Sequence, residues 1–548
     1  MNKPTRFQVS LFVIAVLAMV ALAVREWHNY TVGFFLDDGM YVVLADALAQ
    51  RANYGWYFMP ESLQSTHLPF GFPLLLAPLL LILPGQYDFL RVVSLTASVL
   101  NLNLIFWGWR RFAPGFSYWW AIVLVALLAL SPLTILFSRV VLSEAPFLMW
   151  CLLAIFFSER IASKPNRWDA AAFGIASVGL VFTRTIGWFI LFALVVYLIL
   201  KLRATVWRSL AIAAAAFFIL SGILVAGTSL QMRDFFPSGY LQILSEGVVI
   251  KKTSVNSAGD AAPTQTAGIG SIPSSYLRIV WNGIWVHLDF LDWLPSQIEK
   301  DVGTFLEENS LNALRVVPSL LVLALLVYGF IRWYLASGLT AFWLVAPMYL
   351  VVILFWAWEG SRFFYPVQPQ IVFALLTAGF SILGVVTRAF SNPIVLRTAS
   401  TVVLLSLIMT VQVLIDLRSG SWFVPRETRG GDVEWISKET PENAVVMTTR
   451  PTTYYLYVKR QFVPLPTSRD EEQDLAQRIR QWNVDYVITT DPAHPMYVLK
   501  SSTSNSSKQL HARTAELVER GVLVRRYMLK DVDESIFQVD NGQFAQEP

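Results

Sequence analysis

The sequence has little charge, few histidines and almost no cysteine. Charged residues make up 15% of the 548 residues, well below the ~25% of a soluble globular domain. The single cysteine, Cys151, excludes an intrachain disulfide. The net charge is only +4, and the cations gather at the ends of apolar runs rather than in a basic patch, so no nucleic-acid partner is expected.

Apolar residues are abundant instead. They make up 55% of the chain, and the mean hydropathy is +0.52. Long apolar runs recur from Phe7 to about Ile415, whereas residues 416–548 are charged and mixed. The sequence therefore predicts a polytopic α-helical membrane bundle over residues 1–415 and a small soluble α/β domain over 416–548.

The first apolar run, 7–24, is longer than the core of a signal peptide, so an uncleaved span is favoured. Counting runs against the positive-inside rule predicts about eleven spans, with the N-terminus in the cytoplasm and the C-terminus outside the cell membrane. Outer loops are expected at 25–89 and 228–314. The proline-rich run 69–84 is interpreted as a juxtamembrane or re-entrant segment, because counting it as a span would place Arg110 and Arg111 outside. The predicted spans are 7–24, 90–109, 118–137, 145–157, 170–182, 186–200, 210–226, 316–331, 339–356, 366–383 and 400–415.

The C-terminal region alternates short strand-like and helix-like segments. Strands are expected at 444–448, 484–489, 522–529 and 535–539, and helices at 474–482 and 512–519. This region contains no Walker loop, no dinucleotide glycine fingerprint and no His/Cys cluster at metal-ligand spacing. A role in packing or acceptor binding is therefore favoured over catalysis.

Two adjacent carboxylates, Asp37 and Asp38, follow the first predicted span. Charge beside a membrane is costly and is usually retained for function. The predicted topology places further acids and cations on the same outer face, and this set predicts an active site there: His67, Arg139, Glu144, Arg184, Glu359 and Arg362.

An active site on the outer face has no supply of cytoplasmic nucleotide sugars. A transferase there needs a sugar donor carried on a lipid phosphate. It also needs a carboxylate to take the proton of an acceptor hydroxyl, cations or a metal to bind the departing phosphate, and an apolar groove for the lipid. The acids and cations of the outer face match these requirements.

Several short motifs resemble the GT-C superfamily of membrane glycosyltransferases, especially its protein O-mannosyltransferase and aminoarabinose transferase branch (glycosyltransferase 39/83-like). The motifs occur in the order typical of that branch. They are Asp37-Asp38 followed by Tyr41, the proline-rich segment 66–73, Ser138-Arg139 with Glu144 following, Phe182-Thr183-Arg184, and Ser361-Arg362-Phe363-Phe364-Tyr365-Pro366.

The resemblance implies an inverting sugar transfer with Asp37 as catalytic base and Asp38 orienting the acceptor or a cation. Arg139, Arg184 and Arg362 would contact the donor phosphate, as would His67, which stands where many relatives have a lysine. Glu144 would position an arginine or join a metal site, and Tyr41 would support the acceptor or the loop. A divalent metal is possible in this group. The expected partners are a polyprenyl-phosphate sugar, a glycan, lipid or protein acceptor, and membrane lipids.

Other interpretations stay open. The acidic pair is also compatible with a solvated turn, Glu144 with a structural ion pair to Arg139, and the outer arginines with interfacial anchors. A transporter or flippase for lipid-linked saccharides would share the groove and the cations, but it favours ionisable residues at the bilayer midplane. A non-catalytic assembly partner would not need the acidic pair.

Overall fold

The computed structural model describes most of the membrane region and most of the C-terminal region. The described residues are 3–25, 27, 32–33, 37–51, 54–59, 63–64, 68–202, 206–226, 316–354, 361–388, 430–465, 475–490, 513–528, 534–540 and 542. The predicted span 400–415 and the whole of the predicted outer loop 228–314 lie outside them.

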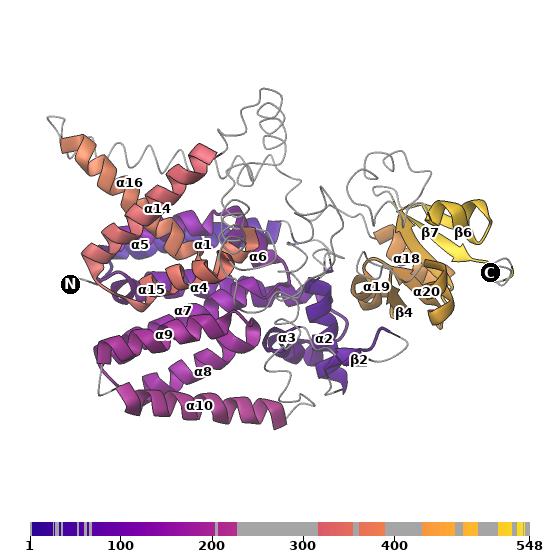
Figure 1. The fold of residues 1–548 in the computed structure, drawn as a ribbon, viewed down its shortest axis with the longest axis horizontal. Helices are drawn as coiled ribbons and strands as arrows, with labels where there is room; N and C mark the ends of the chain where they lie inside the picture. Colours follow the sequence, from indigo (N-terminus) through magenta and orange to yellow (C-terminus); the bar gives the residue numbers. More distant parts are fainter. Residues whose placement is uncertain are drawn as a thin grey trace, which may run out of the picture.

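The membrane region is a bundle of apolar helices (Figure 1). Helix α7 packs against α4 and α8, α8 packs against α10, and α14 packs against α16. Their bounds are α1 (Arg6–Arg25), α4 (Arg91–Phe112), α5 (Tyr118–Ala129), α6 (Pro132–Arg139), α7 (Glu144–Ser163), α8 (Arg167–Thr183), α9 (Gly187–Leu202), α10 (Val206–Ala226), α14 (Val316–Ser337), α15 (Ala341–Leu354) and α16 (Gln368–Arg388).

Four helical segments in the described part of the chain are long and apolar enough to cross a membrane. They are Arg6–Arg25, Tyr87–Phe112, Glu144–Ser163 and Val206–Leu224. Shorter apolar helices, among them α9 and α15, accompany them. Each predicted span that falls on described residues coincides with helix. The count of about eleven spans and their orientation stay predictions.

One predicted span differs from the structure. Residues 118–137 were expected to form a single helix, but α5 and α6 meet at a bend of 62°. The break falls at Leu130 and Ser131, directly before Pro132. Proline lacks the backbone N–H that would continue the helix and disfavours helical geometry at the preceding residue. Pro132 instead begins α6, where its missing donor has no cost.

Between α1 and α4 lie two short helices and a small hairpin. They are α2 (Asp37–Arg51), the strands β1 (Gly55–Trp56) and β2 (Leu63–Gln64), α3 (Gly71–Ile82) and the 3-10 turn η1 (Tyr87–Leu90). α3 covers the proline-rich run, is only 12 residues long and packs against α2 and α8. Leu81 and Ile82 at its end remain exposed.

The C-terminal region contains a five-stranded mixed sheet in the order β4-β3-β5-β7-β6. β3 pairs in parallel with β4 and β5, whereas β7 pairs antiparallel with β5 and β6. The predicted strands 444–448, 484–489, 522–529 and 535–539 correspond to β3, β5, β6 and β7. The elements are α18 (Gly430–Glu439), β3 (Val445–Thr448), α19 (Pro451–Val458), β4 (Gln461–Pro464), α20 (Leu475–Trp482), β5 (Tyr486–Thr490), β6 (Leu523–Met528) and β7 (Glu534–Val539).

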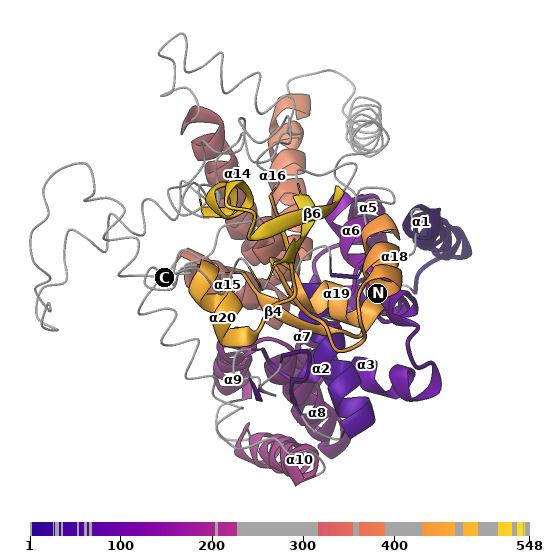
Figure 2. The ribbon, with the colours of Figure 1, turned by 90° about the vertical axis from the view of Figure 1, so that its right-hand side faces the viewer.

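This sheet lies beside the end of the bundle that carries α2 and the β1–β2 hairpin (Figures 1 and 2). The contact is made by α19, which packs on α2. A backbone hydrogen bond of 2.8 Å from the Phe462 N–H to the Phe58 carbonyl extends it to the hairpin region. The two parts of the chain therefore meet at the acidic pair, which begins α2.

Candidate active site

Asp37 and Asp38 form the first turn of α2. The Asp38 carboxylate accepts the backbone N–H of Gly33 at 2.7 Å and that of Gly39 at 2.9 Å, and its side chain is buried. Carboxylates favour the first turn of a helix because they satisfy its unpaired N–H groups. Asp37 is only half-buried. Asp38 thus fixes the turn, whereas the Asp37 side chain stays partly exposed.

Tyr41, one helical turn after Asp37, joins α2 to the start of α7. Its hydroxyl lies 3.2 Å from the Ser143 hydroxyl, with both groups buried. Ser143 directly precedes Glu144, so the residues at the head of α2 lie beside the head of α7. Ser143 is a neighbour of Tyr41 that the sequence did not indicate, and the supporting role of Tyr41 stays a prediction.

Glu144 forms a buried ion pair with Arg184. The distance from the Arg184 Nη1 to the Glu144 Oε1 is 2.7 Å, and the side chains are 16% and 2% exposed. The pair joins the start of α7 to the end of α8. The second oxygen, Oε2, is buried and accepts no hydrogen bond from the part of the chain that the structure describes.

The remaining motifs join the same end of the bundle through apolar contacts. Gly71 of the proline-rich element lies so close to α8 that a Cβ there would be 2.5 Å from the Phe182 carbonyl oxygen. The Phe70 and Phe182 rings are 4.7 Å apart. The Phe137 ring, two residues before Arg139, lies 4.7 Å from the ring of Tyr365.

Of three further residues predicted to contact the phosphate, the structure describes the side chain of only one. Arg139 is buried at the end of α6. Arg362 lies in the 3-10 segment η6 (Ser361–Val367), but its side chain is outside the described part, as is the whole of His67. Glu359 also lies outside it.

A polar stripe inside the bundle was not predicted from the sequence. Ser94, Ser98 and Asn101 are buried on one face of α4, and Ser98 and Asn101 lie beside the Tyr365 hydroxyl. The Ser94 hydroxyl oxygen makes no hydrogen bond within the described ranges. The spacing i, i+4, i+7 of small polar residues in an apolar run is the signal that would have identified this face.

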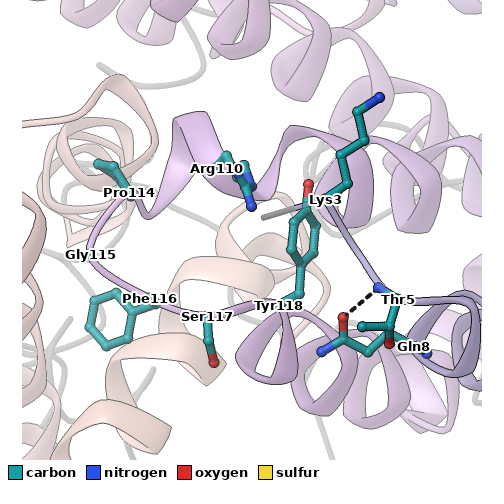
Figure 3. Close-up of a pocket in the computed structure, with 9 residues that line it drawn as sticks. All are labelled: Lys3, Thr5, Gln8, Arg110, Pro114, Gly115, Phe116, Ser117 and Tyr118. Atoms are coloured by element: carbon teal, nitrogen blue, oxygen red, sulfur yellow. Dashed lines mark hydrogen bonds between the residues drawn. The ribbon is translucent and has the colours of Figure 1, made fainter. Parts of the chain in front are cut away.

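A pocket of about 370 Å³ lies at the opposite end of α4 from the η1 turn (Figure 3). Lys3, Gln8, Arg110 and Tyr118 line it together with the α4–α5 connection. Arg110 lies over the Tyr118 ring, 5.2 Å from its centroid. None of its lining residues belongs to the acidic motif, and the predicted topology places it on the cytoplasmic side.

Comparison with solved structures decides the fold. An archaeal oligosaccharyltransferase, AglB from Archaeoglobus fulgidus, in complex with an inhibitory peptide and a dolichol-phosphate, matches 99% of this chain and 75% of its own, with 13% identity and a TM-score of 0.53. ArnT from Cupriavidus metallidurans bound to undecaprenyl phosphate matches 96% of this chain and 98% of its own, with 12% identity and a TM-score of 0.53. The chain has the GT-C fold. No protein-family model and no curated protein sequence matches it.

The predicted GT-C resemblance is thereby confirmed at the level of the fold. An Archaeoglobus fulgidus oligosaccharyltransferase in complex with Zn and sulfate matches 96% of this chain and 73% of its own, with 12% identity and a TM-score of 0.56. In the described part of the chain, no three His, Cys, Asp or Glu side chains gather as metal ligands would. A divalent metal therefore stays a prediction.

Proposed function

We propose that the chain transfers a sugar from a polyprenyl-phosphate donor to an acceptor outside the cell membrane, with inversion at the anomeric carbon. The observation that carries the proposal is the contact between Tyr41 and Ser143, which joins the acidic turn to the Glu144–Arg184 pair. A carboxylate with access to a reactant and a buried cation thus belong to one connected set of side chains in a GT-C fold.

In the proposed step, the Asp37 carboxylate takes the proton of an acceptor hydroxyl. The acceptor oxygen forms a bond to the anomeric carbon as the bond from that carbon to the phosphate oxygen breaks. The electron pair leaves with the phosphate, so the products are the glycosylated acceptor and the polyprenyl phosphate. Asp38 holds the turn through the Gly33 and Gly39 N–H groups.

Arginines bind the departing phosphate in this proposal. Arg184 is already oriented by Glu144, and a guanidinium binds phosphate oxygens through charge-assisted N–H donors. Arg139, Arg362 and His67 are proposed to complete the phosphate site. Stabilising charge as it develops on the leaving group is commonly the largest contribution to such a reaction.

We further propose the predicted membrane arrangement of the chain. About eleven spans would place the N-terminus in the cytoplasm, and the site and the 416–548 domain outside. Single cysteines in a Cys151→Ala background test this proposal. A cysteine replacing the exposed Lys438 should react with an impermeant maleimide in intact cells, whereas one replacing the exposed Lys164 should react only after lysis. The reverse labelling pattern would show that the chain has the opposite orientation in the membrane.

The catalytic test compares wild type with Asp37→Asn. Purified protein in nanodiscs receives a panel of radiolabelled polyprenyl-phosphate sugars with membrane extract as acceptor. Glu434→Gln, which neutralises an exposed acid of α18, is the matched control. Wild type and the control should transfer sugar, and Asp37→Asn should bind the donor but lose at least about 100-fold in turnover, the scale of a missing general base.

The same assay separates the other function classes. A transporter or flippase for lipid-linked saccharides would bind the donor and move it across a vesicle membrane, with little change in Asp37→Asn. A non-catalytic assembly partner would show neither transfer nor transport. Equal turnover of wild type and Asp37→Asn on an accepted donor would reject Asp37 as the base.

A further inference from the structure

The acidic turn is flanked by two glycines, and both lie against the first turn of α19. A Cβ added at Gly33 would be 2.1 Å from the Thr453 Oγ1, and one added at Gly39 would be 3.0 Å from the Thr452 Oγ1. Gly33 also has a φ of +93°, which side chains rarely adopt. The two glycines therefore provide the space in which consecutive threonines from a distant part of the chain approach the acids.

Hydrogen bonds connect Thr453 to Asp38 through Gly33. The Thr453 hydroxyl donates to the Gly33 carbonyl at 3.0 Å, and the Gly33 N–H donates to the Asp38 carboxylate at 2.7 Å. Thr453 is fully buried. One residue of the turn thus binds α19 through its carbonyl and Asp38 through its N–H, directly beside Asp37.

Further contacts hold α19 against the bundle on both sides of the turn. The Tyr457 hydroxyl accepts the Val32 N–H at 3.2 Å, and the Lys459 ammonium lies 3.0 Å from the Asp46 carboxylate. The ion pair is at the edge, since the Lys459 side chain is 42% exposed. The contact of Thr453 is buried instead, and its hydroxyl is oriented by the hydrogen bond to the Gly33 carbonyl.

We propose that Thr453, with Thr452 packed beside it, is a positioning residue for the proposed base Asp37. The first turn of α19 fixes the backbone of Gly33, Gly33 and Gly39 fix Asp38, and the turn thereby presents Asp37 to the acceptor. The C-terminal region thus contributes to the geometry of the active site. This inference rests on the proposed function, and it assigns no contact with the reactants to either threonine.

Thr453→Val tests the inference because it keeps the size of the side chain and removes the donor. Thr453→Ser keeps the donor, and Lys459→Gln breaks the edge ion pair without touching the turn. We expect Thr453→Val to lower kcat about tenfold with KM for the donor nearly unchanged, because one lost hydrogen bond of about 1 kcal/mol would loosen the turn that presents Asp37. Thr453→Ser and Lys459→Gln should stay near wild type.

Amide hydrogen exchange of segment 32–39 provides a second measurement that does not depend on turnover. Thr453→Val should speed exchange there, and Lys459→Gln should not. The inference would be overturned if exchange and kcat were unchanged in Thr453→Val. It would also be overturned if Thr453→Val and Lys459→Gln had equal effects, because the contact would then only hold α19 against the bundle. Faster exchange combined with no transfer by wild type would retain the positioning of the turn and reject the proposed function instead.

Discussion

The Glu144–Arg184 pair gives a prediction that separates stability from catalysis. Breaking a buried ion pair on one side costs roughly 3–5 kcal/mol, because the remaining charge stays buried. The two partners are unequally buried, with 2% of the Glu144 side chain exposed and 16% of that of Arg184. The carboxylate left by Arg184→Gln therefore has less access to water than the guanidinium left by Glu144→Gln.

We expect Arg184→Gln to lower the free energy of unfolding by about 3–4 kcal/mol and Glu144→Gln by about 2 kcal/mol, since glutamine retains one acceptor oxygen. The double variant should recover a large part of the loss, because no unpaired charge remains. Transfer activity should stay low in all three, since each lacks the oriented cation. Stability and activity therefore respond differently in the double variant.

Thermal unfolding can be followed with a thiol-reactive dye, since Cys151 is the only cysteine and is fully buried in α7. Losses that add in the double variant would show that the pair has no coupling energy. A double variant with full activity would refute the role of Arg184 in binding the donor phosphate. A larger loss in Glu144→Gln than in Arg184→Gln would contradict the reasoning from burial.

Two further predictions concern packing and pH. Gly71→Ala should cost about 1–3 kcal/mol by overpacking against the Phe182 carbonyl, whereas Gly379→Ala, with nothing nearby in α16, should slightly raise the Tm; melting curves of both check this. Burial raises the pKa of Asp432 to about 6, against the lowering effect of the Tyr454 hydrogen bond. Because the folded-state pKa exceeds the ordinary value of 3.8, stability is lost as pH rises from about 4 to about 6. Asp432→Asn should therefore be more stable than wild type near neutral pH, by up to about 2–3 kcal/mol, with the Tm difference disappearing at about pH 4; a constant difference would be evidence against this pKa.

Much of the bundle could be predicted from sequence because membrane helices are encoded by local composition. Apolar runs bounded by Arg110-Arg111 and by Lys201 end where α4 and α9 end. The local chemistry of proline predicts a break in the helix at Pro132, although a single span was expected there. The start of α2 at Asp37 was not predicted, since its capping depends on the Gly33 N–H as well as on neighbouring residues.

α19 was missed for a different reason. Its sequence, Pro451-Thr452-Thr453-Tyr454-Tyr455-Leu456-Tyr457-Val458, is rich in β-branched and aromatic residues and by propensity favours a strand. Pro451 at the first helical position and the tertiary contacts of the threonines and tyrosines favour the helix instead. Local propensity is a weak guide where side chains such as Thr453 and Tyr457 have partners more than 400 residues away.

The same separation explains why the site could be predicted only as a set of residues and not as an arrangement. The hydrogen bond between Thr453 and Gly33 spans 420 residues of chain, and Tyr41 and Ser143 are 102 residues apart. The entropic cost of closing such loops grows only slowly with their length, so contacts between distant residues can still stabilise the fold. Such contacts leave no periodic signal in the sequence. The sequence does show what the contact with α19 requires locally, which is a glycine on each side of the acidic pair. A flanking glycine marks a place where another part of the chain approaches, and here that part is the C-terminal region.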